Sequence, residues 1–63
     1  MTIDQLANHA DNLGAFIDRY ADDGEYDESV FIKLVDAWDD MVGELERRGM
    51  SRDELVDRVH CPL

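Results

Sequence analysis

The stretch from Val30 to Leu45 constrains the fold of this chain more than any other part of it. Its apolar residues recur at helical spacing, at positions 30, 31, 34, 35, 37, 38, 41, 42 and 45. This pattern makes two adjacent sides of one helix apolar, whereas a single packing seam would be narrower. We therefore predict a helix from about residue 28 to about residue 48 that packs between two partners.

A narrower seam precedes this stretch and predicts a helix from about residue 3 to about residue 21. Thr2 and Gln5 have the spacing of a capping box at its start. Gly14 weakens a helix, so we expect a neighbouring helix to approach closely there. The seam itself alternates spacings of three and four residues, as in a heptad pattern, and consists of Ile3, Leu6, Ala10, Leu13, Ile17 and Tyr20.

The acidic segment between these two helices predicts a short turn. Gly24 is expected to end the first helix in the left-handed conformation, and Asp27 is expected to cap the second. Two helices of about twenty residues joined by so short a loop are antiparallel neighbours.

A third, short helix is predicted from about residue 52 to about residue 60. Gly49 suits the end of the second helix, and Ser51 and Glu54 have the spacing of a second capping box. Pro62 cannot continue a helix. The predicted fold is all-α: one domain over residues 1–63, with an antiparallel helical hairpin plus a short third helix. This is either a three-helix bundle or a hairpin that dimerises into a four-helix bundle.

Charge narrows the classes of partner. Sixteen acidic side chains against six basic ones give a net charge of −10, which disfavours direct binding to nucleic acid or to an anionic membrane. A basic protein surface is the natural partner. Alternatively, the acidity serves only solubility or adaptation to high salt. The sequence has no apolar run long enough for a membrane span and no secretory pattern at its start, so we expect a cytoplasmic protein.

Acidic residues recur on one side of each long helix, and we predict that they form an outward face that binds a partner. Four residues of helix rise about 6 Å, similar to the distance between successive phosphates along a nucleic-acid strand. Ile32 lies off the apolar stripe and either receives the third helix or contacts a partner. The candidate partner-binding residues are Asp4, Asp11 and Asp18 on the first helix and Ile32, Asp36, Asp39, Asp40 and Glu44 on the second.

Sites for chemistry have little support in the sequence. The acidic turn fails the calcium-loop pattern, because Arg19 and Val30 would occupy two ligand positions. His60 and Cys61 are too few for a zinc site, and the single cysteine could at most form an intermolecular disulfide. His9 is expected to face solvent. We expect no catalytic residue, no cofactor and no metal, and hence no enzyme.

The leading functional hypothesis is a non-enzymatic, acidic interaction protein that binds the basic, nucleic-acid-binding surface of another protein. It would act as an inhibitor or regulator by imitating a phosphate backbone. Small inhibitors carried by phages or mobile elements are of this physical type, which is an analogy only. The alternative is a helical module for self-association or assembly, a possible homodimer, in which Phe31, Ile32 and Trp38 are the anchors.

Overall fold

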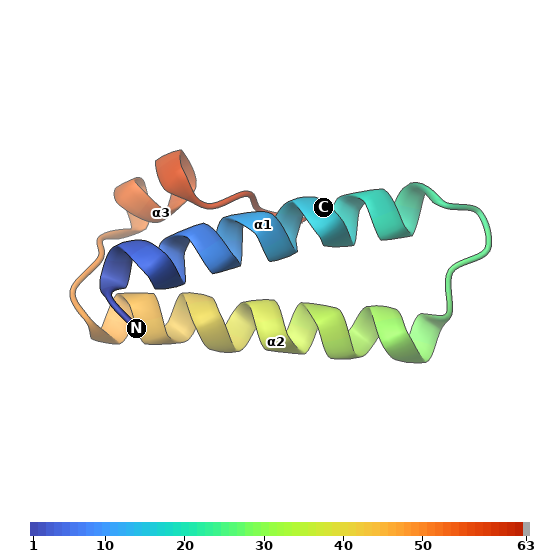
Figure 1. Cartoon of the computed structure of the whole chain (residues 1–63), viewed down its shortest axis with the longest axis horizontal. Coiled ribbons are helices and arrows are strands. Elements are labelled where there is room, and N and C mark those ends of the chain that lie inside the picture. The colour runs from blue at the N-terminus through green and yellow to red at the C-terminus, as the bar shows by residue number, and fades with distance from the viewer. Residues whose placement is uncertain (63) are drawn as a thin grey trace.

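The computed structural model describes residues 1–62, and this part of the chain is entirely helical apart from turns and connections. The helices are α1 (Ile3–Asp22), α2 (Glu28–Arg47) and α3 (Arg52–Arg58). Helices α1 and α2 form an antiparallel hairpin, and α3 lies beside α1 near the open end of that hairpin (Figure 1). The predicted all-α fold is thus confirmed. Within residues 1–62, no helix is long and apolar enough to cross a membrane.

Local hydrogen bonds explain where α1 and α2 begin. The Thr2 hydroxyl accepts a bond from the Gln5 backbone N–H at 3.2 Å, and the Gln5 side chain accepts one from the Thr2 N–H at 2.9 Å. The predicted capping box is therefore present. Asp27 caps α2, because its carboxylate accepts a bond from the Ser29 N–H at 2.9 Å.

The end of α1 differs from the prediction. Asp23 follows the helix in an extended conformation, with its N–H bonded to the Tyr20 carbonyl. Gly24 does not adopt a positive φ; among the described glycines only Gly49 does. The left-handed conformation predicted for Gly24 is wrong, because an extended residue already turns the chain out of the helix.

The end of α2 has the left-handed glycine that commonly ends helices. Gly49 has φ 104°, and the N–H groups of Gly49 and Met50 bond to the carbonyls of Glu46 and Leu45, both at 3.0 Å. This is a Schellman motif, in which the residue after the glycine also packs against the last turn. Here Met50 and Leu45 are both buried in the core.

The connection then leads directly into α3. The Ser51 hydroxyl accepts a bond from the Glu54 N–H at 3.2 Å, as one half of the predicted capping box requires. Helix α3 ends at Arg58, two residues earlier than predicted, because Val59 is already extended.

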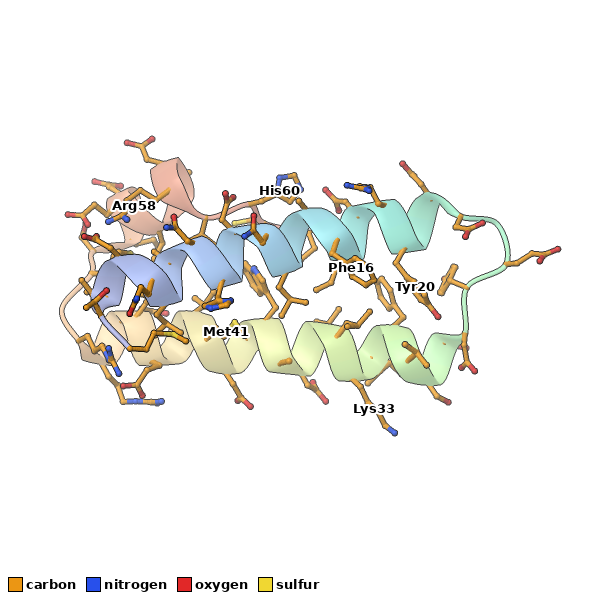
Figure 2. All side chains as sticks on the ribbon, viewed as in Figure 1. Phe16, Tyr20, Lys33, Met41, Arg58 and His60 are labelled. Carbon is orange, nitrogen blue, oxygen red and sulfur yellow. The ribbon has the colours of Figure 1, made fainter. Side chains whose placement is uncertain are left out.

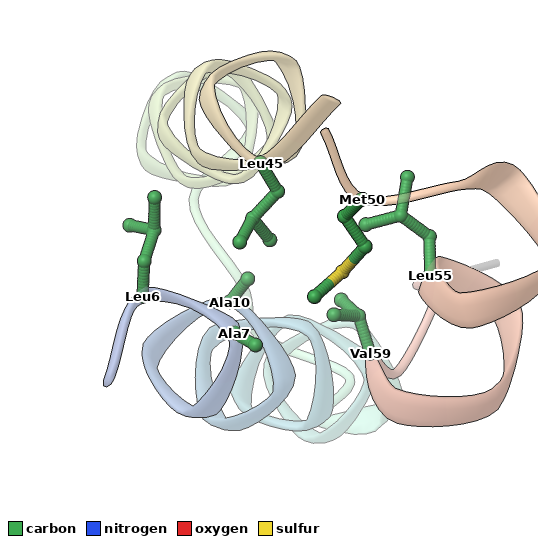
Figure 3. Close-up of a cluster of buried hydrophobic side chains, with 7 residues drawn as sticks. All are labelled: Leu6, Ala7, Ala10, Leu45, Met50, Leu55 and Val59. Carbon is green, nitrogen blue, oxygen red and sulfur yellow. The ribbon is translucent and has the colours of Figure 1, made fainter. Parts of the chain in front are cut away.

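The main core lies at one end of the molecule, where all three helices and the α2–α3 connection meet. Figure 3 shows its buried members, which are Leu6, Ala7, Ala10, Leu45, Met50, Leu55 and Val59. The central element is α1, which packs against both other helices, while α2 and α3 barely touch. Within residues 1–62, only α1 packs along the length of α2, so the second partner predicted for α2 is not a helix of the same chain. Helix α3 has only seven residues, which are too few to cover the second apolar side of a twenty-residue helix.

The other end of the hairpin is held by aromatic rings instead of a closed core. The ring centroids of Phe16 and Tyr20 are 6.1 Å apart, those of Tyr20 and Tyr26 are 5.9 Å apart, and those of Tyr26 and Phe31 are 5.4 Å apart. The Tyr20 hydroxyl also accepts a hydrogen bond from the Asp27 N–H. Phe16 and Tyr26 nevertheless remain 51% and 44% exposed, so this end is only half covered.

Candidate functional site

The strongest candidate site is the side of α2 that points away from α1. Leu34, Met41 and Leu45 are less exposed and recur at helical spacing on the side toward α1. Residues Ile32, Asp36, Asp39 and Asp40 project from the opposite side, and all four are exposed. We call these four residues the outer face of α2.

The carboxylates of the outer face are free of internal partners. Within residues 1–62, Asp36, Asp39 and Asp40 form no ion pair and no side-chain hydrogen bond. The nearest cation in sequence is Lys33, which is exposed and forms no ion pair within residues 1–62 (Figure 2). Like charges at this spacing repel each other by a few tenths of a kcal/mol per pair, about 0.2–0.5. The chain tolerates that repulsion here without neutralising it.

Ile32 is the apolar member of the outer face. Its side chain is 53% exposed, and α3 does not cover it. The sequence left two roles open for Ile32, a contact with the third helix or a contact with a partner. The contact with α3 is thus excluded. A large aliphatic group among unpaired carboxylates gives this face both charge and an apolar anchor.

Glu44, in contrast, is neutralised within its own helix. Its carboxylate accepts bonds from Arg47 at 2.9 and 3.2 Å and from Arg48 at 3.0 Å. The hydrogen bond from Arg47, followed by that from Arg48, lowers the pKa of Glu44. Because the pKa is lowered in the folded state, these contacts stabilise the fold at neutral pH, and the contribution is lost as the pH falls through that pKa. Arg48 also donates to the Met1 carbonyl at 2.7 Å and ties the N-terminus to the end of α2.

The acidic row of α1 also has internal partners. Asp4 pairs with Arg58 at 3.1 Å, Asp11 accepts a bond from the His60 backbone N–H at 2.8 Å, and Asp18 pairs with the His60 ring. Residues 59–62, which we call the C-terminal segment, therefore lie along this side of α1 (Figure 2). From the sequence we expected the acidic rows of α1 and α2 to form one free face. In the structure they do not. The row on α1 holds the chain's own C-terminal segment.

Gly14 makes room for this arrangement. A Cβ atom at this position would lie 2.0 Å from the His60 carbonyl oxygen and 3.0 Å from the Trp38 indole nitrogen. The predicted close approach at Gly14 is therefore present: the backbone after α3 comes nearest, and the Trp38 side chain of the neighbouring helix α2 is also close. The Trp38 indole nitrogen is buried beneath it without a hydrogen-bond partner.

Arg58 and His60 bind acidic residues of α1, and the sequence analysis did not predict either of them as a partner. One signal pointed to them: after Glu46 the chain has four Arg against three acidic residues, while before it acids strongly predominate. That imbalance is consistent with a basic C-terminal part folding back onto an acidic helix. Which carboxylates it reaches depends on the path of the chain.

Two other features complete the surface. A groove of about 190 Å³ between α2 and α3 is lined mainly by apolar side chains, and also by Arg52 and the exposed Cys61. His9 is exposed, as predicted. In the described part of the chain, no three His, Cys, Asp or Glu residues gather in a way that could hold a metal ion.

No protein-family model, no curated protein and no solved structure matches this sequence.

Proposed function

We propose that this protein is a non-enzymatic interaction protein whose outer face of α2 binds the basic surface of another protein. The observation that supports this is the different treatment of the carboxylates. Asp4, Asp11 and Glu44 have internal cationic or N–H partners, whereas Asp36, Asp39 and Asp40 have none within residues 1–62. Unpaired like charges on a rigid helix create a field that steers a basic partner and complements it on contact.

The proposed partner is a protein that itself binds nucleic acid. Helical carboxylates four residues apart are separated by about 6 Å, close to the phosphate repeat that such a surface is built to accept. The protein would occupy this surface and thereby inhibit or regulate nucleic-acid binding, without touching nucleic acid itself. Ile32 supplies an apolar contact beside the acids. The compartment in keeping with this role is the cytoplasm.

Capture from a lysate of the native host at low and high salt, with the whole chain as bait, tests the proposal. We expect one or more basic proteins to bind at low salt and to be released at high salt, because screening weakens contacts between exposed charges. The captured protein should lose its affinity for nucleic acid when this chain is added. Binding that is indifferent to salt would contradict the proposal.

Charge reversal locates the face. The triple variant Asp36→Lys, Asp39→Lys, Asp40→Lys should abolish binding while circular dichroism shows that the helices persist. The matched control reverses three exposed acids at the loop end, Asp22→Lys, Asp23→Lys and Glu25→Lys. It changes the net charge by the same amount and should bind almost as well as the original chain. Equal losses in both variants would mean that only net charge matters, and the outer face would then have no special role.

A further inference from the structure

One exposed side of the molecule carries almost no acid, although the chain as a whole has a net charge of −10. All acids of α1 lie on the side that holds the C-terminal segment or next to it, at positions 4, 11, 18 and 22. The remaining exposed residues of the helix body share another side and include no carboxylate. They are Gln5, Asn8, His9, Asn12, Phe16 and Arg19.

The neighbouring side of α2 is apolar. Val30 is 42% exposed, Ala37 is exposed, and Met41 is half-buried. Figure 2 shows Phe16 and Tyr20 side by side between α1 and α2, with Met41 further toward the other end of the hairpin, while His60 lies at the outer edge of α1. We call the six exposed α1 residues listed above, together with Val30, Ala37 and Met41 of α2, the open face. The closest acid of α2 in this direction is Glu44, whose charge is met by two arginines.

The open face is uncovered because α3 packs elsewhere. A two-helix hairpin has two long sides where a third element can pack, and α3 with the C-terminal segment occupies only one of them. Phe16, at 51% exposed, stands in the middle of the other. With Val30 on α2, Phe16 gives this side exposed aromatic and aliphatic groups of the kind that mark interaction surfaces in soluble proteins.

We propose that a second copy of this chain packs on the open face, so that two hairpins form a four-helix bundle with twofold symmetry. Electrostatic repulsion between copies favours this face over the others. Two copies with a net charge of −10 each repel one another, and contact through the outer face of α2 would bring unpaired carboxylates together. The open face instead brings together amides, apolar groups and Arg19, so it is the side on which two copies meet with least repulsion.

A long side of the molecule approaches the area of a standard dimer interface. The Cα atoms extend over 37 × 18 × 17 Å, so a long side of 37 by 18 Å projects about 670 Å² before side chains are added. A standard specific interface buries about 800 Å² per partner. A dimer would also enlarge the core of a chain that is small for independent folding.

Sedimentation equilibrium of the full chain, from micromolar to millimolar concentration and at low and high salt, tests this inference. We expect a mass of twice 7.2 kDa. The dimer should be as strong or stronger at high salt, because salt screens the net repulsion between copies. Contact between the outer face and a basic partner has the opposite salt dependence, so either proposal can fail without the other. A monomer at every concentration and salt would overturn the inference.

Two variants and a matched control locate the interface. Phe16→Glu should weaken the dimer roughly a hundredfold, because a carboxylate would face its own copy across the twofold axis. Ile32→Glu is the control: its side chain is 53% exposed against 51% for Phe16, and the charge change is identical, but it lies on the outer face of α2. It should leave the dimer within about twofold of the original chain.

Asn12→Glu makes the test independent of folding defects. Asn12 is exposed and outside the core, so its replacement should leave the helical content unchanged and still weaken the dimer at least about tenfold. If Asn12→Glu leaves the dimer intact, or if Ile32→Glu weakens it as much as Phe16→Glu does, two copies do not meet through the open face and the inference is overturned.

Discussion

At Gly14, α1 has no side chain, and the His60 carbonyl lies in the space that a Cβ atom would occupy. Alanine is the better helix former by about 0.8–1 kcal/mol, so its absence here has a reason outside the helix. Because the C-terminal segment lies close to α1 at Gly14, the His60 N–H and ring reach Asp11 and Asp18 on the same side of α1. The missing methyl group thus leaves the space into which the end of the chain packs.

We expect Gly14→Ala to destabilise the protein by about 1–3 kcal/mol, because the group it meets is backbone and can move only if the C-terminal segment shifts. Gly43→Ala is the control on α2: its Cβ would meet only the Arg47 guanidinium, at 3.8 Å. That variant should be more stable by about 0.5–1 kcal/mol. Urea unfolding followed by Trp38 fluorescence measures both. A stabilising Gly14→Ala would show that the C-terminal segment does not pack at this position.

Among the helices, α2 has the most contacts that fix its C-terminal end. Its last turn combines a left-handed Gly49, a buried Met50 and the Arg47 and Arg48 pairs with Glu44. These contacts act together, since the glycine turns the chain so that Met50 reaches Leu45 and Ser51 can cap α3. The direction of α3 therefore depends on the end of α2.

We expect Gly49→Ala to lower the free energy of unfolding by about 1–2 kcal/mol, because an L residue is strained at φ 104°. Gly24→Ala is the comparison, since a Cβ there would meet nothing within 4 Å and its φ is not positive. It should be neutral or stabilising by up to about 1 kcal/mol. Thermal unfolding of both variants measures the difference, and equal effects would contradict the role given to the Schellman motif.

For the molecule as a whole, stability is unevenly distributed along the hairpin. The end that α3 covers holds the main buried cluster, whereas the loop end has aromatic contacts that stay half exposed. Local opening is easier where fewer apolar contacts are buried. The open face and the outer face of α2 are uncovered for another reason, because α3 packs on a different side of the hairpin.

We expect Leu45→Ala to cost about 2–5 kcal/mol, because Leu45 is fully buried and its loss leaves a cavity. In a chain of 63 residues this is enough to unfold much of the population. Val56→Ala, at a side chain that is 67% exposed, should change stability by less than about 0.5 kcal/mol. Hydrogen exchange should be slowest around residues 6–10 and 42–47 and faster around residues 19–31. Uniform exchange would contradict this division.

The sequence by itself determined what depends on neighbours within a few residues. The capping box at Thr2, the Asp27 cap, the glycine at the end of α2 and the three helices follow from hydrogen bonds and packing between residues close in the chain. Gly24 was the exception, because an extended Asp23 ends α1 equally well.

Only the tertiary structure decided which helix is central and which carboxylates are free. Helix α2 has the wider apolar stripe, yet α1 lies in the middle because the chain after α3 folds back onto it. Asp11 and Asp36 both lie within acidic rows of a long helix, but only Asp11 receives His60, 49 residues further along. Such contacts depend on where distant segments meet in space, and no local pattern encodes that.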